Sequence, residues 1–173
     1  LAAGILLLVA ALASTLEAPA RAAAGHRRLD VPRVDAHQHV GPATLGPAMS
    51  LGASQGVRAL VNLSGGRIGE GLEEQIAAAG RFPGRVAVLT SVDFDGCCGP
   101  EWVDREVTAL VQARAAGARG LKVYKNLGLT VRDERGRRVP VDARALDPLW
   151  NAVELLDLPV VIHSGDPRAF FEP

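Results

Sequence analysis

The chain has 173 residues, of which 19 are basic and 19 acidic, so its formal net charge at neutral pH is zero. Proteins that bind nucleic acid present a positive surface to the phosphates, and this balance argues against a nucleic-acid partner. The two cysteines, Cys97 and Cys98, are adjacent, a spacing that disfavours a disulfide and predicts two small loop residues rather than a redox pair.

The first residues of the sequence predict export from the cytoplasm. Residues 1–13 are an unbroken apolar run, and three small-x-small sites follow within residues 18–24. This pattern is typical of a signal peptide over residues 1–25, which places the protein in the periplasm or outside the cell. The alternative is an uncleaved anchor, which would be the protein's contact with a membrane. Residues 26–173 then form one domain, long enough for a hydrophobic core.

Short apolar runs alternate with helical patterns from Val34 onward, which predicts βαβ units and a parallel sheet. Gly99-Pro100 favours the start of a helix and Gly117 its end, and Asp147-Pro148 favours the start of another. An apolar stripe on the first of these helices comprises Val103, Val107, Leu110 and Val111. We expect strands at 33–39, 57–63, 85–93, 119–125 and 159–164, and helices at 48–55, 70–80, 100–117 and from 147.

The first predicted strand carries two histidines at metal-ligand spacing. His37 and His39 are two residues apart, so on a strand their side chains point to the same face, about 6.6 Å apart along the chain. Imidazole nitrogens are common zinc ligands, and Asp35, on the same face by alternation, could orient His37. The alternative is a pair of histidines packed in the core.

Polar side chains also fall near the ends of the other predicted strands. In a parallel barrel the catalytic groups lie at the carboxyl ends of the strands, where these side chains would meet. His163 is the one ionisable residue of its strand and supplies the third imidazole that the His37 and His39 pair lacks. The residues concerned are Asn62, Asp93, Lys122, Tyr124 and His163.

Three segments together resemble the amidohydrolase superfamily. They are Asp35-x-His37-x-His39, Gly120-Leu121-Lys122 and Val161-Ile162-His163, and they are most similar to the amidohydrolase-related branch. That branch includes metal-dependent hydrolases, pyrone dicarboxylate lactonases and decarboxylases of the aminocarboxymuconate-semialdehyde type. The resemblance implies an α/β fold, an incomplete (β/α)8 TIM barrel with about five of the eight βα units. It also implies that His37, His39 and His163 bind a divalent metal ion, most often one Zn²⁺.

A full barrel needs about 250 residues, more than this chain provides. In the family a further histidine follows the sixth strand and an aspartate the eighth, so we expect the chain to be the N-terminal portion of such a barrel. An open barrel exposes an unpaired strand edge, so a second expectation is an inactive, poorly soluble fragment.

For the intact protein the resemblance implies a metal-dependent hydrolase that cleaves an amide, ester or lactone bond of a small molecule. Lys122 and Tyr124 are the predicted catalytic residues, binding substrate oxygen, and strand alternation favours Lys122 over Lys125 as the inward-facing lysine. Some relatives carry a carboxylated lysine between two metal ions, but the single ion of this branch favours an unmodified one. Non-hydrolytic decarboxylation by the same ligands remains the alternative, and the sequence leaves the oligomeric state open.

Overall fold

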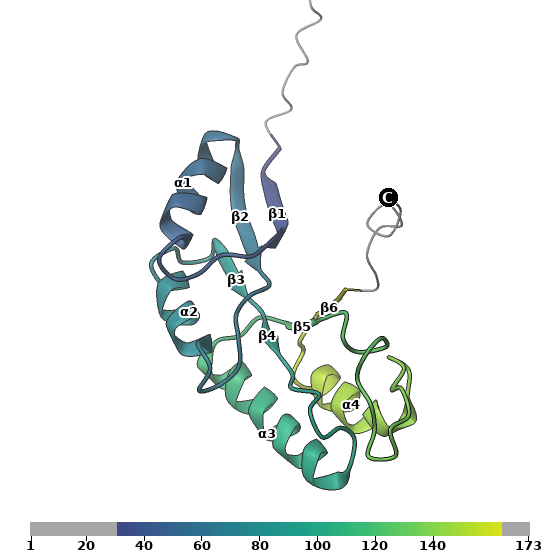
Figure 1. Ribbon diagram of the computed structural model, residues 1–173. Helices are drawn as coiled ribbons and strands as arrows, with labels where there is room; N and C mark the ends of the chain where they lie inside the picture. The colour runs from purple at the N-terminus through teal and green to yellow at the C-terminus, as the bar shows by residue number, and fades with distance from the viewer. Residues whose placement is uncertain (1–30, 164–173) are drawn as a thin grey trace, which may run out of the picture. The chain divides into compact units, whose positions relative to one another are not determined.

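The computed structural model describes residues 31–163, in which short strands and helices alternate (Figure 1). The order of elements in this part of the chain confirms the predicted alternation. The elements are β1 (Arg33–Gln38), α1 (Leu45–Ser54), β2 (Val57–Asn62), α2 (Leu72–Ala79), β3 (Val86–Val88), β4 (Thr90–Ser91), α3 (Pro100–Ala116), β5 (Leu121–Val123), the 3-10 helix η1 (Arg144–Leu146), α4 (Asp147–Leu155) and β6 (Val160–Ile162).

The first sheet has the strand order β1-β2-β3, and all its strands are parallel. Helix α1 packs against β2 and helix α2 against β3, so the two helices lie alongside this sheet (Figure 1). Leu45 and Met49 of α1 contact Leu60 of β2 and Ala78 of α2 in a small apolar cluster. This cluster fixes the carboxyl ends of β1 and β2 relative to the two helices.

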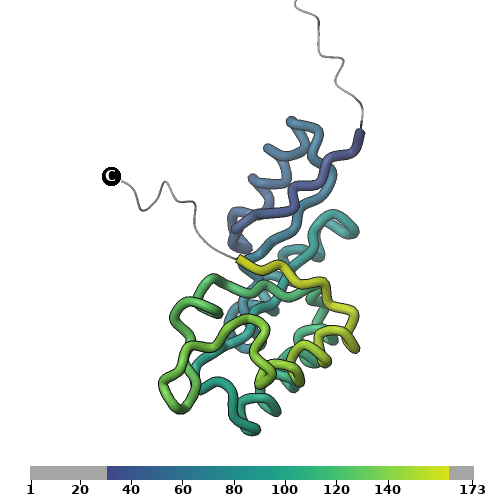
Figure 2. The backbone as a smooth tube through the Cα atoms, turned by 90° about the vertical axis from the view of Figure 1, so that its right-hand side faces the viewer, coloured from purple at the N-terminus to yellow at the C-terminus, as the bar shows by residue number. Residues whose placement is uncertain are grey.

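The second sheet has the strand order β4-β5-β6, and its strands are also parallel. Lys122 of β5 pairs with Ser91 on one side and Val161 on the other, so its backbone is held by strands on both sides. Helices α3 and α4 pack against each other, and residues 124–143 form a long loop beside α4 (Figure 2). The largest buried apolar cluster joins these helices, β5 and the loop.

The predicted TIM barrel is wrong. Residues 31–163 form two three-stranded parallel sheets with four α-helices, a small mixed α/β domain. The stretch expected to be one strand, 85–93, is divided between β3, which pairs with β2, and β4, which pairs with β5. The strands of residues 31–163 therefore form two separate three-stranded sheets and not the continuous sheet of a barrel.

Helix α3 begins and ends at the predicted residues, but only part of the predicted stripe is buried. Gly99 precedes Pro100 at the helix start, and Gly117 ends the helix with a φ of 121°. Leu110 of the stripe is buried as predicted and Val103 and Val107 are half-buried, whereas Val111 is exposed. The helix also buries Trp102, Glu106 and Ala113. The indole Nε1 of Trp102 donates to the carbonyl of Asp93, and a carboxylate oxygen of Glu106 accepts from the amide of Asp93. These polar contacts turn the helix toward the chain that follows β4.

Cys97 and Cys98 form a disulfide between adjacent residues, so the prediction of two unlinked cysteines is wrong. They lie in the turn before α3, where the amide of Cys97 donates to the carbonyl of Phe94 at 3.2 Å. This turn brings the two neighbouring side chains together, and Cys97 is fully buried in the apolar cluster.

The predicted leader, residues 1–25, lies outside the described residues, as does Ser164 at the end of the fifth predicted strand. Across residues 31–163, no helix combines the length and the apolar character needed to span a bilayer.

Candidate functional site

The two histidines of β1 converge at its carboxyl end. His37 is in the strand, and His39 follows it one residue beyond Gln38. Their Nε2 atoms lie 3.2 Å apart, with the ring planes inclined by 62°. A tetrahedral zinc ion with Zn–N bonds of about 2.0 to 2.1 Å holds two imidazole nitrogens about 3.3 Å apart. The pair therefore fits a shared divalent ion with little movement of either ring.

A β-bulge in β1 places Asp35 away from these rings. Asp35 pairs with Leu60 of β2, and Gln38 pairs with Asn62. Three residue steps along β1 therefore match only two steps along β2, which defines the bulge. The extra residue breaks strict alternation, so Asp35 does not share the histidine face as predicted. Its carboxylate accepts hydrogen bonds from the side chain of Gln38 and from the backbone amide of His37, and these bonds, Gln38 first, lower the pKa of Asp35.

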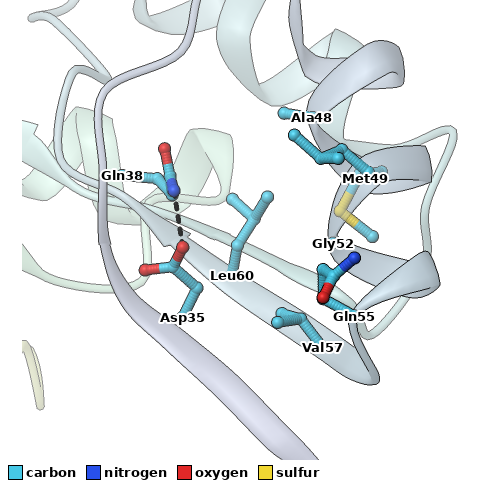
Figure 3. Close-up of a pocket in the computed structure, with 9 residues that line it drawn as sticks. Asp35, Gln38, Ala48, Met49, Gly52, Gln55, Val57 and Leu60 are labelled. Carbon is cyan, nitrogen blue, oxygen red and sulfur yellow. Dashed lines mark hydrogen bonds between the residues drawn. The ribbon is translucent and has the colours of Figure 1, made fainter.

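A cavity of about 290 Å³ lies between β1, β2 and α1 (Figure 3). Met49, Leu51 and Leu60 contribute to a mostly apolar wall, and the hydrogen-bonded pair of Asp35 and Gln38 contributes the polar part. Of the residues predicted near the site only Asp35 lines this cavity, and none of the predicted metal ligands or catalytic residues does.

Ser64 holds the His39 ring from the other side. Its Oγ lies 2.7 Å from Nδ1 of His39. A serine hydroxyl can donate or accept, so either tautomer of the imidazole satisfies this hydrogen bond. Only the tautomer with its hydrogen on Nδ1 leaves the Nε2 lone pair free for a cation next to His37. Ser64 thus orients the His39 ring and is compatible with its ligating form.

Two buried amide side chains fix the backbone on both sides of this hydrogen bond. Asn62 is fully buried; its Nδ2 donates to the carbonyl of Val40 at 2.9 Å and its Oδ1 accepts from the amide of Ser64 at 3.0 Å. Gln75 of α2 donates from Nε2 to the carbonyls of Val40, at 2.9 Å, and Ser64, at 3.1 Å. The ends of β1 and β2 are therefore tied to each other and to α2, immediately beside His39.

Lys122 and Tyr124 lie at the end of β5. Lys122 is buried, with 1% of its surface exposed, whereas Lys125 lies on the surface. Strand alternation predicts this difference between the two lysines. The Lys122 Nζ lies 5.6 Å from the centre of the Tyr124 ring. The Tyr124 hydroxyl donates to the carbonyl of Leu63 at 2.9 Å, next to Ser64. Its proton is therefore engaged by the backbone, and Tyr124 links the end of β5 to the end of β2.

His163 directly follows β6, where its amide donates to the carbonyl of Val123 at 3.0 Å. The pKa of His39 lies below its usual value, first because of burial and then because of electrostatic interactions with His37, Lys122 and His163. His163 is therefore close enough to act on His39 electrostatically. A set of three ligand side chains around one point, however, is not found within residues 31–163. A low pKa keeps His39 neutral, the form that binds metal.

Asp93, another polar group predicted at a strand end, is engaged elsewhere. Its carboxylate forms an ion pair with Arg67 at 2.8 Å. Arg67 also binds Glu70, so its guanidinium bridges two carboxylates in the loop between β2 and α2. Asp93 thus helps to fix this loop, and the structure does not bring it to the histidine pair.

Sequence reasoning did not single out Ser64 and Gln75 as individual residues of the site. Gln75 carried a signal: it lies three residues after Leu72, on the stripe that α2 buries. A polar residue on that stripe indicates a buried hydrogen-bonding role. Ser64 carried no comparable signal, because its contact with His39 spans 25 residues of sequence.

Comparison with protein-family models gave no match to this chain, and comparison with curated proteins gave none either.

Proposed function

We propose that the protein is a metal-dependent hydrolase that cleaves an amide, ester or lactone bond of a small molecule, with His37 and His39 as ligands of one divalent ion. The observation that carries the proposal is the 3.2 Å separation of the two Nε2 atoms. This separation agrees with the ligand spacing of tetrahedral zinc, about 3.3 Å. The proposal requires neither a barrel nor a family match.

The residues around the pair suit a metal ligand set. Burial and electrostatic interactions with neighbouring basic groups lower the pKa of His39, which favours its neutral ring. Ser64 orients that ring through Nδ1. We propose His163 as the third ligand, since it adjoins the same group of side chains. An ion bound here supplies a Lewis acid that polarises a carbonyl group and activates water.

The chain's own side chains have distinct tasks in this proposal. Lys122 donates a hydrogen bond from Nζ to a substrate oxygen. Tyr124 contributes its ring as a wall of the site, because its hydroxyl proton is donated to Leu63. Ser64 and the amide pair of Asn62 and Gln75 keep His39 in place while substrate binds and product leaves.

Zinc titration of the metal-free protein tests the proposal. Wild type should bind one zinc ion per chain, and His37→Ala or His39→Ala should each weaken binding by more than about 100-fold, beyond the effect of losing an outer partner. His163→Ala tests the third ligand in the same way. His26, which lies outside the described residues and outside the ligand set, provides a matched control in His26→Ala.

Zinc binding that is unchanged in both His37→Ala and His39→Ala would overturn the proposal. Activity is measured on the same samples, with nitrophenyl esters, anilides and a simple lactone as substrates. Zinc-dependent turnover that His37→Ala abolishes is the expected result. Stoichiometric zinc binding without turnover of any of these substrates would keep the metal site and reject the hydrolase.

A further inference from the structure

The use of lysine in this sequence is highly selective. Of its 19 basic residues 17 are arginines, and the two lysines, Lys122 and Lys125, both lie at the end of β5. Arginine remains protonated in proteins, whereas a buried lysine can lose its proton and become a nucleophile. At the buried position 122, lysine can therefore act as a nucleophile, which arginine cannot.

Lys122 has no counter-charge in the described part of the chain. No hydrogen bond or ion pair joins its Nζ to another of these residues, and the face of the Tyr124 ring, centred 5.6 Å away, attracts a cation but carries no negative charge. Burial lowers the pKa of the amine. A larger fraction of Lys122 is therefore neutral than of a fully solvated lysine at the same pH.

The amine is nevertheless not completely closed off from solvent. Every fully buried side-chain nitrogen or oxygen in residues 31–163 has a hydrogen-bond partner, and Lys122 Nζ has none. The Nζ atom is therefore not fully buried, although the residue as a whole is only 1% exposed. Its backbone is held between strands β4 and β6, which pair with β5 on either side. The result is a partly desolvated amine on a fixed backbone, with its end still touching solvent.

We propose that Lys122 is a reactive amine that captures small aldehydes or ketones as an imine. The Nζ lone pair attacks the carbonyl carbon, and the carbonyl electron pair moves to oxygen. A proton passes from nitrogen to that oxygen to give a carbinolamine. Loss of one water molecule then gives the C=N bond, so amine and carbonyl compound are converted to imine and water. No metal ion takes part in this reaction, so it can be tested independently of the proposed hydrolase activity.

Reductive trapping of the full-length, metal-free protein tests the inference. Propanal is the probe, and sodium cyanoborohydride at pH 7 supplies hydride to the imine carbon, leaving a stable propyl amine. Peptide mass mapping gives separate rates for Lys122 and for the exposed Lys125. In the folded protein Lys122 should react about tenfold faster than Lys125, because more of its amine is unprotonated. A Lys122 rate equal to or below that of Lys125 would overturn the inference.

Unfolding and two substitutions provide the controls. In guanidinium chloride both lysines become solvated amines, so their rates should converge; a preference for Lys122 that persists there would mean that the fold does not cause it. Lys125→Arg should keep the fast adduct, and Lys122→Arg should lose it. The opposite pattern would assign the reactivity to Lys125. A zinc titration of the same samples tells separately whether the histidine site holds a metal.

Discussion

The Oγ of Ser64 lies 2.7 Å from Nδ1 of His39, across 25 residues of sequence, and joins the end of β2 to the second histidine of β1. The Nε2 of the same ring lies 3.2 Å from that of His37. One nitrogen of His39 is thus bound to the protein scaffold, and the other faces its partner histidine. Ring orientation at the candidate site therefore depends on a residue that is not itself a proposed ligand.

Substitution Ser64→Ala should weaken zinc binding by about tenfold, the effect expected when a metal ligand loses its outer hydrogen-bond partner. In the metal-free protein, the ¹⁵N chemical shift of His39 Nδ1 should change, because this nitrogen loses its hydrogen-bond partner. Ser64→Thr retains the hydroxyl and should behave as wild type.

The matched control for Ser64 is Ser54→Ala. The Ser54 hydroxyl donates to the carbonyl of Leu51 at the end of α1, remote from the histidines, so neither zinc affinity nor the ¹⁵N shift of His39 Nδ1 should change. If Ser64→Ala has the same affinity and the same ¹⁵N shifts as Ser54→Ala, Ser64 does not orient His39.

Substitution Gln75→Leu should destabilise the fold by about 1 to 3 kcal/mol, the cost of leaving buried polar groups without partners. The change removes hydrogen bonds to the carbonyls of Val40 and Ser64 and one from Asn62. Urea unfolding at constant m-value measures the loss. Gln55→Leu, at an exposed position after α1, should stay within about 0.5 kcal/mol of wild type. Equal stabilities of the two variants would contradict a structural role for the amide pair.

Local signals in the sequence predicted most elements but not their assembly. Pro100 and Gly117 correctly marked the ends of α3, because both residues act within one turn of the backbone. Which side chains α3 buries depends also on the hydrogen bonds of Trp102 and Glu106 to Asp93, so the predicted stripe was right at Leu110 and wrong at Val111. The barrel prediction was wrong because residues 85–93 are divided between strands of two different sheets, and an apolar run carries no sign of that division.

The candidate site was predictable only in part, because local sequence signals do not show how distant segments come together. The two-residue spacing of His37 and His39 brought their rings together at the carboxyl end of β1, as expected. Asp35 does not follow strand alternation, because the bulge before Gln38 adds one residue to β1. The composition of the strand does not reveal this bulge. Whether His163 binds the same ion as the pair stays a prediction.

Substitution Gly65→Ala should destabilise the protein by more than about 2 kcal/mol, because the backbone must move to admit the side chain. A Cβ at Gly65 would lie 2.0 Å from the carbonyl oxygen of Leu89, at the junction of the two sheets. The movement would also displace the adjacent Ser64, so zinc affinity should fall with stability.

The control for Gly65 is Gly46→Ala in α1, where nothing lies within 4 Å of the added Cβ. Alanine favours a helix over glycine by about 1 kcal/mol, so this variant should be more stable than wild type. Urea unfolding compares the two. A Gly65→Ala protein as stable as wild type would mean that the loop does not pack tightly on Leu89.

The loop between β5 and α4 should show a carboxyl group that titrates below its ordinary pKa of 3.8. Asp133 accepts hydrogen bonds from the backbone amides of Arg137, at 2.8 Å, and Arg135, at 3.0 Å, and from the Arg137 side chain, and these lower its pKa. Because the folded pKa is the lower one, these bonds stabilise the loop fully above 3.8, and the stabilisation is lost as the pH falls through the folded value.

Carboxyl ¹³C shifts give the titration midpoint of Asp133 directly. Arg137→Ala should raise this midpoint only partway toward 3.8, because the backbone amide of residue 137, the largest contributor to the lowered pKa, remains. Arg138→Ala should leave it unchanged, since the Arg138 guanidinium donates to the carbonyl of Gly128 and not to Asp133. A wild-type midpoint at or above 3.8 would show that the loop does not hold Asp133 in this hydrogen-bonded arrangement in solution.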